Sequence, residues 1–291
     1  MQDVIDTVDM EILMHRDAHF GGSFEIMLEY YDQDGVGVMP DFEIEQIVYL
    51  QKIETDQKQN LSETYLPDAA KDSVEEAKRI YHQLREVYDQ KGEKLISDLI
   101  LSEENHPENE IQALVDQGKD SVPALIHLVS SRVFYDPLYP GYGRSPIFAA
   151  KCLGKIQDER AIPPLFEALG QENFFTDEEI ILALASFGNR AKSFLITRLK
   201  QEPLSKDNEY AAISLSGFPE DDEIAAAALE VLERETTLKR PLFASYLIFA
   251  CSDLTKSSLQ ERFIRVSKTN GLSKSIQDEM MVVIKNWKKT V

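Results

Sequence analysis

Apolar residues recur every three or four positions along most of the 291-residue chain, which predicts amphipathic helices joined by short polar breaks. The most regular stretch covers residues 149–169. It contains two apolar groups at helical spacing with a polar turn between them, namely Ala149, Ala150 and Leu153, and then Leu165, Ala168 and Leu169. A helix pair of this size cannot bury its own apolar face, so we expect the unit to repeat along the chain.

The turn inside this unit is predicted from its glycine, aspartate and proline residues. Gly154 is expected to end the first helix in a left-handed cap, and Asp158 to cap the segment that follows. Pro163 and Pro164 fit only in the first turn of the second helix, because proline has no backbone N–H to donate. The unit is therefore expected to be a helix, a tight turn and a second helix.

The same pattern recurs less regularly elsewhere. In two further units a glycine lies seven residues before the leucine of the second helix, as in Gly118 with Leu125 and Gly188 with Leu195. Gly154 and Gly188 are 34 residues apart, within the period of helical-pair arrays. Weaker units cover residues 211–232 and 243–266, and a helix over residues 273–288 is expected to cap the array.

These patterns predict an all-α chain organised as an α-solenoid. Residues 107–291 are expected to form the array, and residues 1–106 an acidic helical portion that continues into it. Helices in this amino-terminal portion are expected over residues 3–16, 41–52 and 68–90.

Residues 20–40 leave two alternatives open. A helix from Phe24 to Tyr31, capped by Ser23, is favoured because Ile26, Met27, Tyr30 and Tyr31 share one helical face. The other alternative is a strand that enters a hairpin at Asp34-Gly35.

The unit at residues 149–165 has the sequence Ala-Ala-x-x-Leu-Gly-x-Ile-x-Asp-x-Arg-Ala-Ile-Pro-Pro-Leu, which resembles the HEAT-like repeats first associated with phycobilisome lyases. Looser matches extend over residues 108–266. The resemblance implies a right-handed α-solenoid whose second helices line a concave surface. It implies no single activity, because HEAT-like arrays include scaffolds, transport factors, chromophore lyases and a few enzymes.

Charge changes this picture in one respect. The net charge is −20, and residues 1–110 contain 27 acidic and 9 basic residues, a net charge of −18. Such a surface disfavours nucleic acid and anionic membranes as partners and favours a protein with a basic surface. The alternative is that the acidity serves solubility alone.

Composition points to the cytoplasm. No apolar run reaches the length of a membrane span, and the amino terminus lacks the pattern of a secretory signal. The two cysteines, Cys152 and Cys251, lie in apolar helical segments, as expected for buried thiols in a reducing compartment.

Candidate chemistry is sparse. His15 and His19 are four residues apart, so on a helix both rings could face one metal ion, although histidines near a helix end more often cap it or donate at the surface. None of the five histidines precedes a glutamate, as in HEAT-like di-iron hydroxylases, and neither a phosphate-binding loop nor a Cys-x-x-Cys motif occurs. We therefore predict no catalytic residue and no cofactor.

Residues 132–144, the insertion, interrupt the array with four aromatic residues, two prolines and two arginines. Tyrosine and arginine dominate the energetics of protein interfaces, so the insertion is a candidate partner-binding site. The alternative is that its rings fold down over the neighbouring helices. The candidate binding residues are Phe134, Tyr135, Tyr139, Tyr142 and Arg144.

The sequence therefore predicts a non-catalytic scaffold or adaptor that binds another protein. The alternative, implied only by the subtype of the repeats, is a phycobilin lyase or a chaperone-like protein that acts on a tetrapyrrole-carrying partner.

Overall fold

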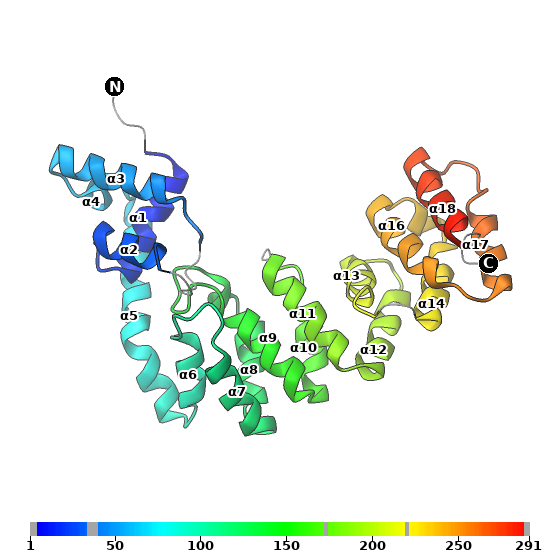
Figure 1. Cartoon of the computed structure of the whole chain (residues 1–291), viewed down its shortest axis with the longest axis horizontal. Coiled ribbons are helices and arrows are strands. Elements are labelled where there is room, and N and C mark those ends of the chain that lie inside the picture. Colours follow the sequence, from blue (N-terminus) through cyan, green and yellow to red (C-terminus); the bar gives the residue numbers. More distant parts are fainter. Residues whose placement is uncertain (1–4, 34–39, 172–173, 219–220, 288–291) are drawn as a thin grey trace. The chain divides into compact units, whose positions relative to one another are not determined.

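The computed structural model describes residues 5–33, 40–171, 174–218 and 221–287, and the regular elements in these ranges are all helices (Figure 1). The predicted all-α class is therefore confirmed. The chain divides into two compact units, each described by itself below. The first unit consists of Met1–Pro164 with Gln171–Thr176, and the second of Leu165–Gly170 with Asp177–Val291.

The first unit begins with helices that surround an apolar core. They are α1 (Thr7–His19), α2 (Phe24–Tyr31), α3 (Ile44–Gln57), α4 (Leu61–Tyr65) and α5 (Asp68–Gln90). Helix α1 packs on α3, α4 and α5, and α2 packs on α3. Fully buried residues at the centre include Ile12, Leu13, Met27, Ile47 and Leu50.

The first unit continues with helices that pack in sequence order. They are α6 (Lys94–Ile100), α7 (Glu108–Gln117), α8 (Val122–Ser130) and α9 (Ser145–Ile156). Helix α6 packs on both α5 and α7, and α9 packs on both α7 and α8. The predicted boundary between residues 106 and 107 therefore lies inside this unit, between two helices in contact.

The second unit is also built from helices. Helix α10 (Ile162–Glu167) and helix α11 (Phe174–Ser186) each begin in residues of the first unit. The helices that follow are α12 (Asn189–Lys200), α13 (Lys206–Leu215), α14 (Asp222–Leu232), α15 (Glu235–Leu238), α16 (Pro241–Ala250), α17 (Ser257–Val266) and α18 (Lys274–Trp287). Helix α16 packs on α13, α14 and α18, and α12 packs on α13 and α14.

Local capping chemistry sets several helix ends. Ser23 Oγ accepts a hydrogen bond from the Ile26 N–H at 3.3 Å, which confirms the predicted cap and the helical alternative for α2. The hairpin residues Asp34 and Gly35 lie outside the described residues. Helix α1 begins at Thr7, later than predicted, because Asp6 and Asp9 form a reciprocal capping box.

The predicted role of Gly154 is wrong. Helix α9 continues to Ile156, and Gln157 takes the left-handed position with a φ of 56°. Asp158 follows directly and caps the next turn, accepting from the Arg160 N–H at 3.1 Å, as predicted. The left-handed residue therefore lies immediately before the capping aspartate, and Gly154 is buried within the helix. Gly188, the turn glycine of another unit, has a positive φ of 58°.

Some apolar residues that lie at helical spacing face solvent. They are each between 42% and 50% exposed, namely Val8, Ile26, Ile44, Val48, Tyr81, Val87 and Met281. Helical spacing identifies the apolar face of a helix. The position of the neighbouring helix determines which residues of that face are buried and which stay exposed at its edge.

Candidate functional site

The insertion packs onto the first unit. Phe134, Tyr142 and Arg144 are buried, and Tyr135 and Tyr139 are partly buried. This burial favours the alternative in which the rings fold over neighbouring helices. Contact with a partner through Phe134 or Arg144 would require the insertion to rearrange, so these two side chains are structural in this conformation.

The backbone around Tyr142 is strained. Gly141, Tyr142 and Gly143 have consecutive positive φ values of 91°, 58° and 73°. A Cβ atom on Gly141 would lie 2.6 Å from the Ile100 carbonyl oxygen, and one on Gly143 would lie 2.8 Å from that of Tyr135. Only glycine fits on either side, and a bulky residue such as tyrosine rarely adopts this conformation. Strain of this kind costs about 1–3 kcal/mol and persists where the surroundings enforce it.

Arg144 anchors the end of the insertion, two residues after Tyr142. Its Nη1 and Nη2 donate to the carbonyl oxygens of Glu104 and Ser102, both at 3.0 Å. Its guanidinium carbon lies 5.2 Å from the centre of the Phe148 ring and 5.8 Å from that of Tyr142. Burial lowers the pKa of Arg144 to about 10. Arg144 therefore fastens the insertion to the segment that joins α6 to α7.

Tyr142 meets the histidine pair of α1. Its ring centre lies 4.5 Å from that of His19 and 5.6 Å from that of His15, and the two histidine rings are 4.8 Å apart. His19 Nε2 also donates to the Pro137 carbonyl oxygen at 3.0 Å. Two features that the sequence marks separately, the histidines and the insertion, thus form one aromatic cluster.

Both histidines are buried enough to favour the neutral ring. Burial lowers the pKa of His19 from 6.5 to about 4, and burial followed by the charge of His19 lowers the pKa of His15 well below 6.5. His15 is 1% exposed, so the expectation of a surface or capping histidine is wrong for this residue. Among the described residues, neither ring nitrogen of His15 has a hydrogen-bond partner.

A metal ion at His15 and His19 stays a prediction. The described part of the chain contains no group of three or more histidine, cysteine, aspartate or glutamate residues that could hold a metal ion. His19 Nε2 is already engaged by Pro137, which leaves Nδ1 as its available ligand atom.

An aromatic pocket of about 310 Å³ opens beside this cluster. Tyr30 Oη donates to Glu103 Oε2 at 3.0 Å within it, and Tyr81 is 47% exposed. Burial raises the pKa of Tyr142, and the charges of Glu103, Tyr30 and Tyr81 raise it further. The lining residues are Asp17, Ala18, His19, Phe20, Gly21, Ile26, Tyr30, Lys78, Tyr81, His82, Glu103 and Tyr142.

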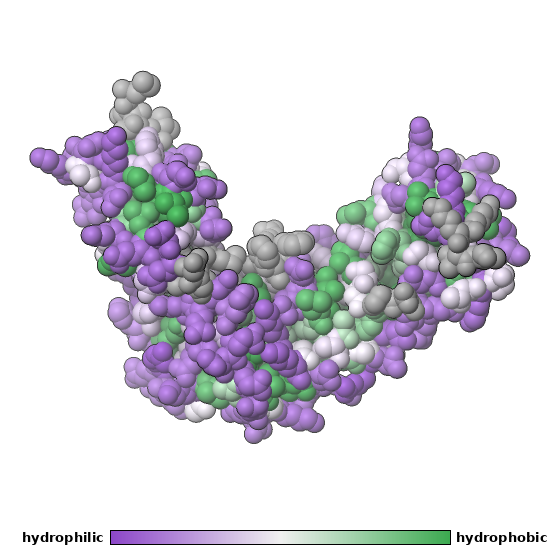
Figure 2. Space-filling model, viewed as in Figure 1, coloured by the Kyte–Doolittle hydropathy of each residue, from purple (hydrophilic) through white to green (hydrophobic). Residues whose placement is uncertain are grey.

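An acidic groove of about 710 Å³ adjoins the aromatic pocket, and Glu103 lines both. The groove runs over α5, α6 and α7, where most of the visible surface is hydrophilic (Figure 2). Its only basic side chain among the described lining residues, Arg85, is paired with Asp98 at 2.7 Å. The lining residues are Arg85, Leu95, Asp98, Leu101, Ser102, Glu103, Glu104, Asn109, Glu110 and Ala113.

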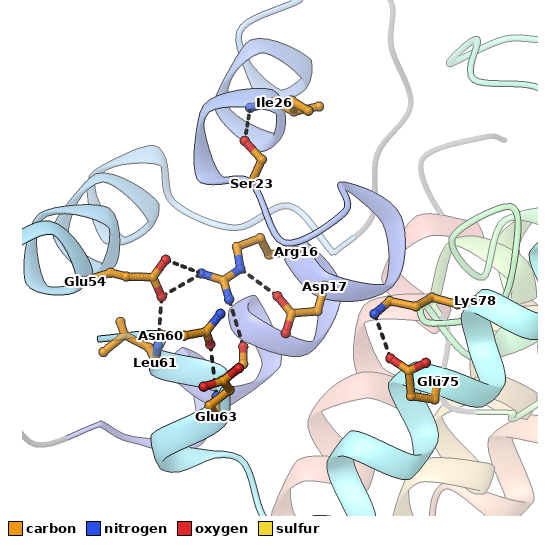
Figure 3. A network of polar contacts seen from close by, with 11 residues as sticks. Arg16, Asp17, Ser23, Ile26, Glu54, Asn60, Leu61, Glu63, Glu75 and Lys78 are labelled. Carbon is orange, nitrogen blue, oxygen red and sulfur yellow. Dashed lines mark hydrogen bonds and ion pairs between the residues drawn. The ribbon is translucent and has the colours of Figure 1, made fainter. Parts of the chain in front are cut away.

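A buried arginine supports the wall of the aromatic pocket (Figure 3). Arg16 is fully buried, and its guanidinium donates to Asp17 at 2.7 Å, to Glu54 at 3.0 Å and to Ser62 at 2.9 Å. Its guanidinium carbon also lies 4.3 Å from the centre of the Phe24 ring. Arg16 thus joins α1, α2, α3 and α4, and fixes the adjacent pocket residue Asp17. The sequence offered no signal for this role.

Comparison with known proteins gives one match. The family model for HEAT repeats matches residues 145–216, from the start of α9 to just beyond α13. No curated protein and no solved structure matches the chain. The predicted HEAT-like repeats are thereby confirmed for this range, whereas nothing in the comparisons supports the phycobilisome-lyase subtype. Within the residues that the structure describes, no helix has the length and apolar character needed to cross a membrane.

Proposed function

We propose that the protein is a non-catalytic scaffold that binds another protein, and that the acidic groove receives a basic segment of that partner. HEAT repeats commonly mediate protein–protein interaction, which supports the first part. The observation that supports the second part is the unbalanced charge of the groove. Four carboxylates, those of Asp98, Glu103, Glu104 and Glu110, line it together with one guanidinium.

The charge outside the groove points the same way. The net charge of −18 over residues 1–110 would in addition accelerate encounter with a basic partner.

Neutralising two groove carboxylates is expected to weaken binding of a fluorescent lysine heptapeptide about tenfold. The reason is that Glu104→Gln with Glu110→Gln removes two attractions, each of about 0.5–1 kcal/mol. Fluorescence anisotropy at low and at high salt measures the affinity, and the variant is expected to lose affinity less steeply as salt rises.

The matched control is Glu45→Gln with Glu63→Gln. Both residues are exposed in the first unit, and neither lines the groove. This variant has the same net charge as the test variant and is expected to change the affinity less than twofold. An equal loss of affinity for the lysine peptide in the two variants would show that the overall charge of the protein, and not the groove, attracts the peptide.

We propose a cytoplasmic location, which the state of the two thiols supports. Cys152 and Cys251 are both free and buried. Burial raises the pKa of Cys152 to about 12 and also raises that of Cys251, so neither is a reactive thiolate at neutral pH.

A further inference from the structure

We propose that the aromatic pocket binds an arginine side chain of the basic segment that occupies the acidic groove. This inference rests on the proposed function and adds a residue-level specificity to it. The two hollows share Glu103, so a chain that follows the groove passes the mouth of the pocket.

The pocket has the groups that bind an organic cation. Tyr30, Tyr81 and Tyr142 line it, and the negative face of an aromatic ring attracts a cation. Glu103 adds a full negative charge. Tyr30 donates to its Oε2, and no hydrogen bond reaches its Oε1 from the described residues, which leaves that oxygen for a donor on the ligand.

Three other titratable groups that line the pocket are neutral or already paired. Burial keeps His19 neutral at physiological pH. Lys78 Nζ forms an ion pair with Glu75 at 2.8 Å, and Glu75 does not line the pocket. Asp17 is paired with Arg16, which leaves Glu103 as the carboxylate that a ligand would meet.

Arginine fits this combination better than lysine. A guanidinium is planar and weakly hydrated, stacks on aromatic rings and donates two parallel hydrogen bonds to a carboxylate. A lysine ammonium ion holds its water more strongly and would lose more hydration on entering a pocket lined by rings. The backbone at Tyr142 is strained, and this strain costs free energy. Strain of this kind is common at ligand-binding sites.

The test compares a lysine heptapeptide with the same peptide carrying one central arginine. Fluorescence anisotropy on the full-length protein is expected to show about fivefold to tenfold tighter binding of the arginine peptide. Tyr81→Leu and Tyr30→Leu are each expected to abolish this preference and to leave the affinity for the lysine peptide within about twofold. Tyr49→Leu is the matched control, because Tyr49 is 42% exposed and does not line the pocket.

The outcomes separate this inference from the proposed function. If the lysine peptide does not bind, the acidic groove is not a basic-peptide site and both proposals fail. If it binds and no arginine preference exists, or if the preference survives in Tyr81→Leu, only the pocket proposal fails. Lys78→Ala is expected to keep or increase the preference, and a loss of preference there would indicate an anionic ligand. A stronger preference for a trimethyllysine peptide than for the arginine peptide would overturn the assignment of arginine.

Discussion

Replacing Arg16 with methionine is expected to lower the free energy of unfolding by about 2–4 kcal/mol. Arg16 is fully buried, and it is the ion-pair partner of both Glu54 and Asp17. Its removal leaves two poorly exposed carboxylates without their counter-charge, which is the costly way to break a buried ion pair. The lower part of the range allows for the residual solvent exposure of the two carboxylates, 25% for Glu54 and 17% for Asp17.

Chemical denaturation followed by circular dichroism measures this effect. The control is Arg79→Met, because Arg79 pairs with Glu76 on the exposed face of α5. An exposed pair of this kind contributes less than about 1 kcal/mol. Similar losses in the two variants would contradict the role assigned to Arg16 as the link between α1, α3 and α4.

Acidification from pH 6.5 to pH 4 is expected to destabilise the first unit by about 3 kcal/mol through His19. Its pKa falls from 6.5 in the unfolded chain to about 4 in the folded one, so the unfolded state binds the proton more readily. The neutral ring contributes fully to the free energy of unfolding above pH 6.5. This contribution is lost as the pH falls toward 4, at about 1.4 kcal/mol per pH unit. His15 adds a loss of the same sign, because its pKa is also lowered.

Denaturation curves at several pH values test this dependence. His19→Gln keeps a donor for the Pro137 carbonyl and cannot be protonated, so the variant is expected to lose less stability between pH 6.5 and pH 4 than the wild type does. The control is His106→Gln, because His106 is exposed and lies outside the aromatic cluster. An unchanged pH dependence in His19→Gln would show that other groups cause the acid sensitivity.

Local chemistry made much of the fold predictable. Pro67-Asp68 marks the start of α5, Ser23 caps α2, and Gly188 turns the chain between α11 and α12, because each effect depends on residues within one turn of the helix. Gly154 shows the limit of such inference. A glycine near a predicted helix end is a good cap, but here the left-handed position lies three residues later, directly before Asp158.

The candidate site was less predictable, because it depends on contacts between distant residues. His19 and Tyr142 are more than 120 residues apart in the chain, and their rings are in contact. Each was marked by the sequence for another reason, His19 for metal binding and Tyr142 for direct partner contact. The glycines on either side of Tyr142 were the one local signal that its backbone is unusual. Nothing in the sequence indicated that Glu103 would join the aromatic pocket to the acidic groove.

The most direct test of the proposed function is to map where a basic peptide binds. A lysine heptapeptide with one arginine and a photoreactive end group can be cross-linked to the full-length protein and the products located by mass spectrometry. The proposal predicts cross-links on the residues that line the acidic groove and the aromatic pocket, all of which belong to the first unit. Cross-links concentrated on α12–α18 of the second unit would contradict it.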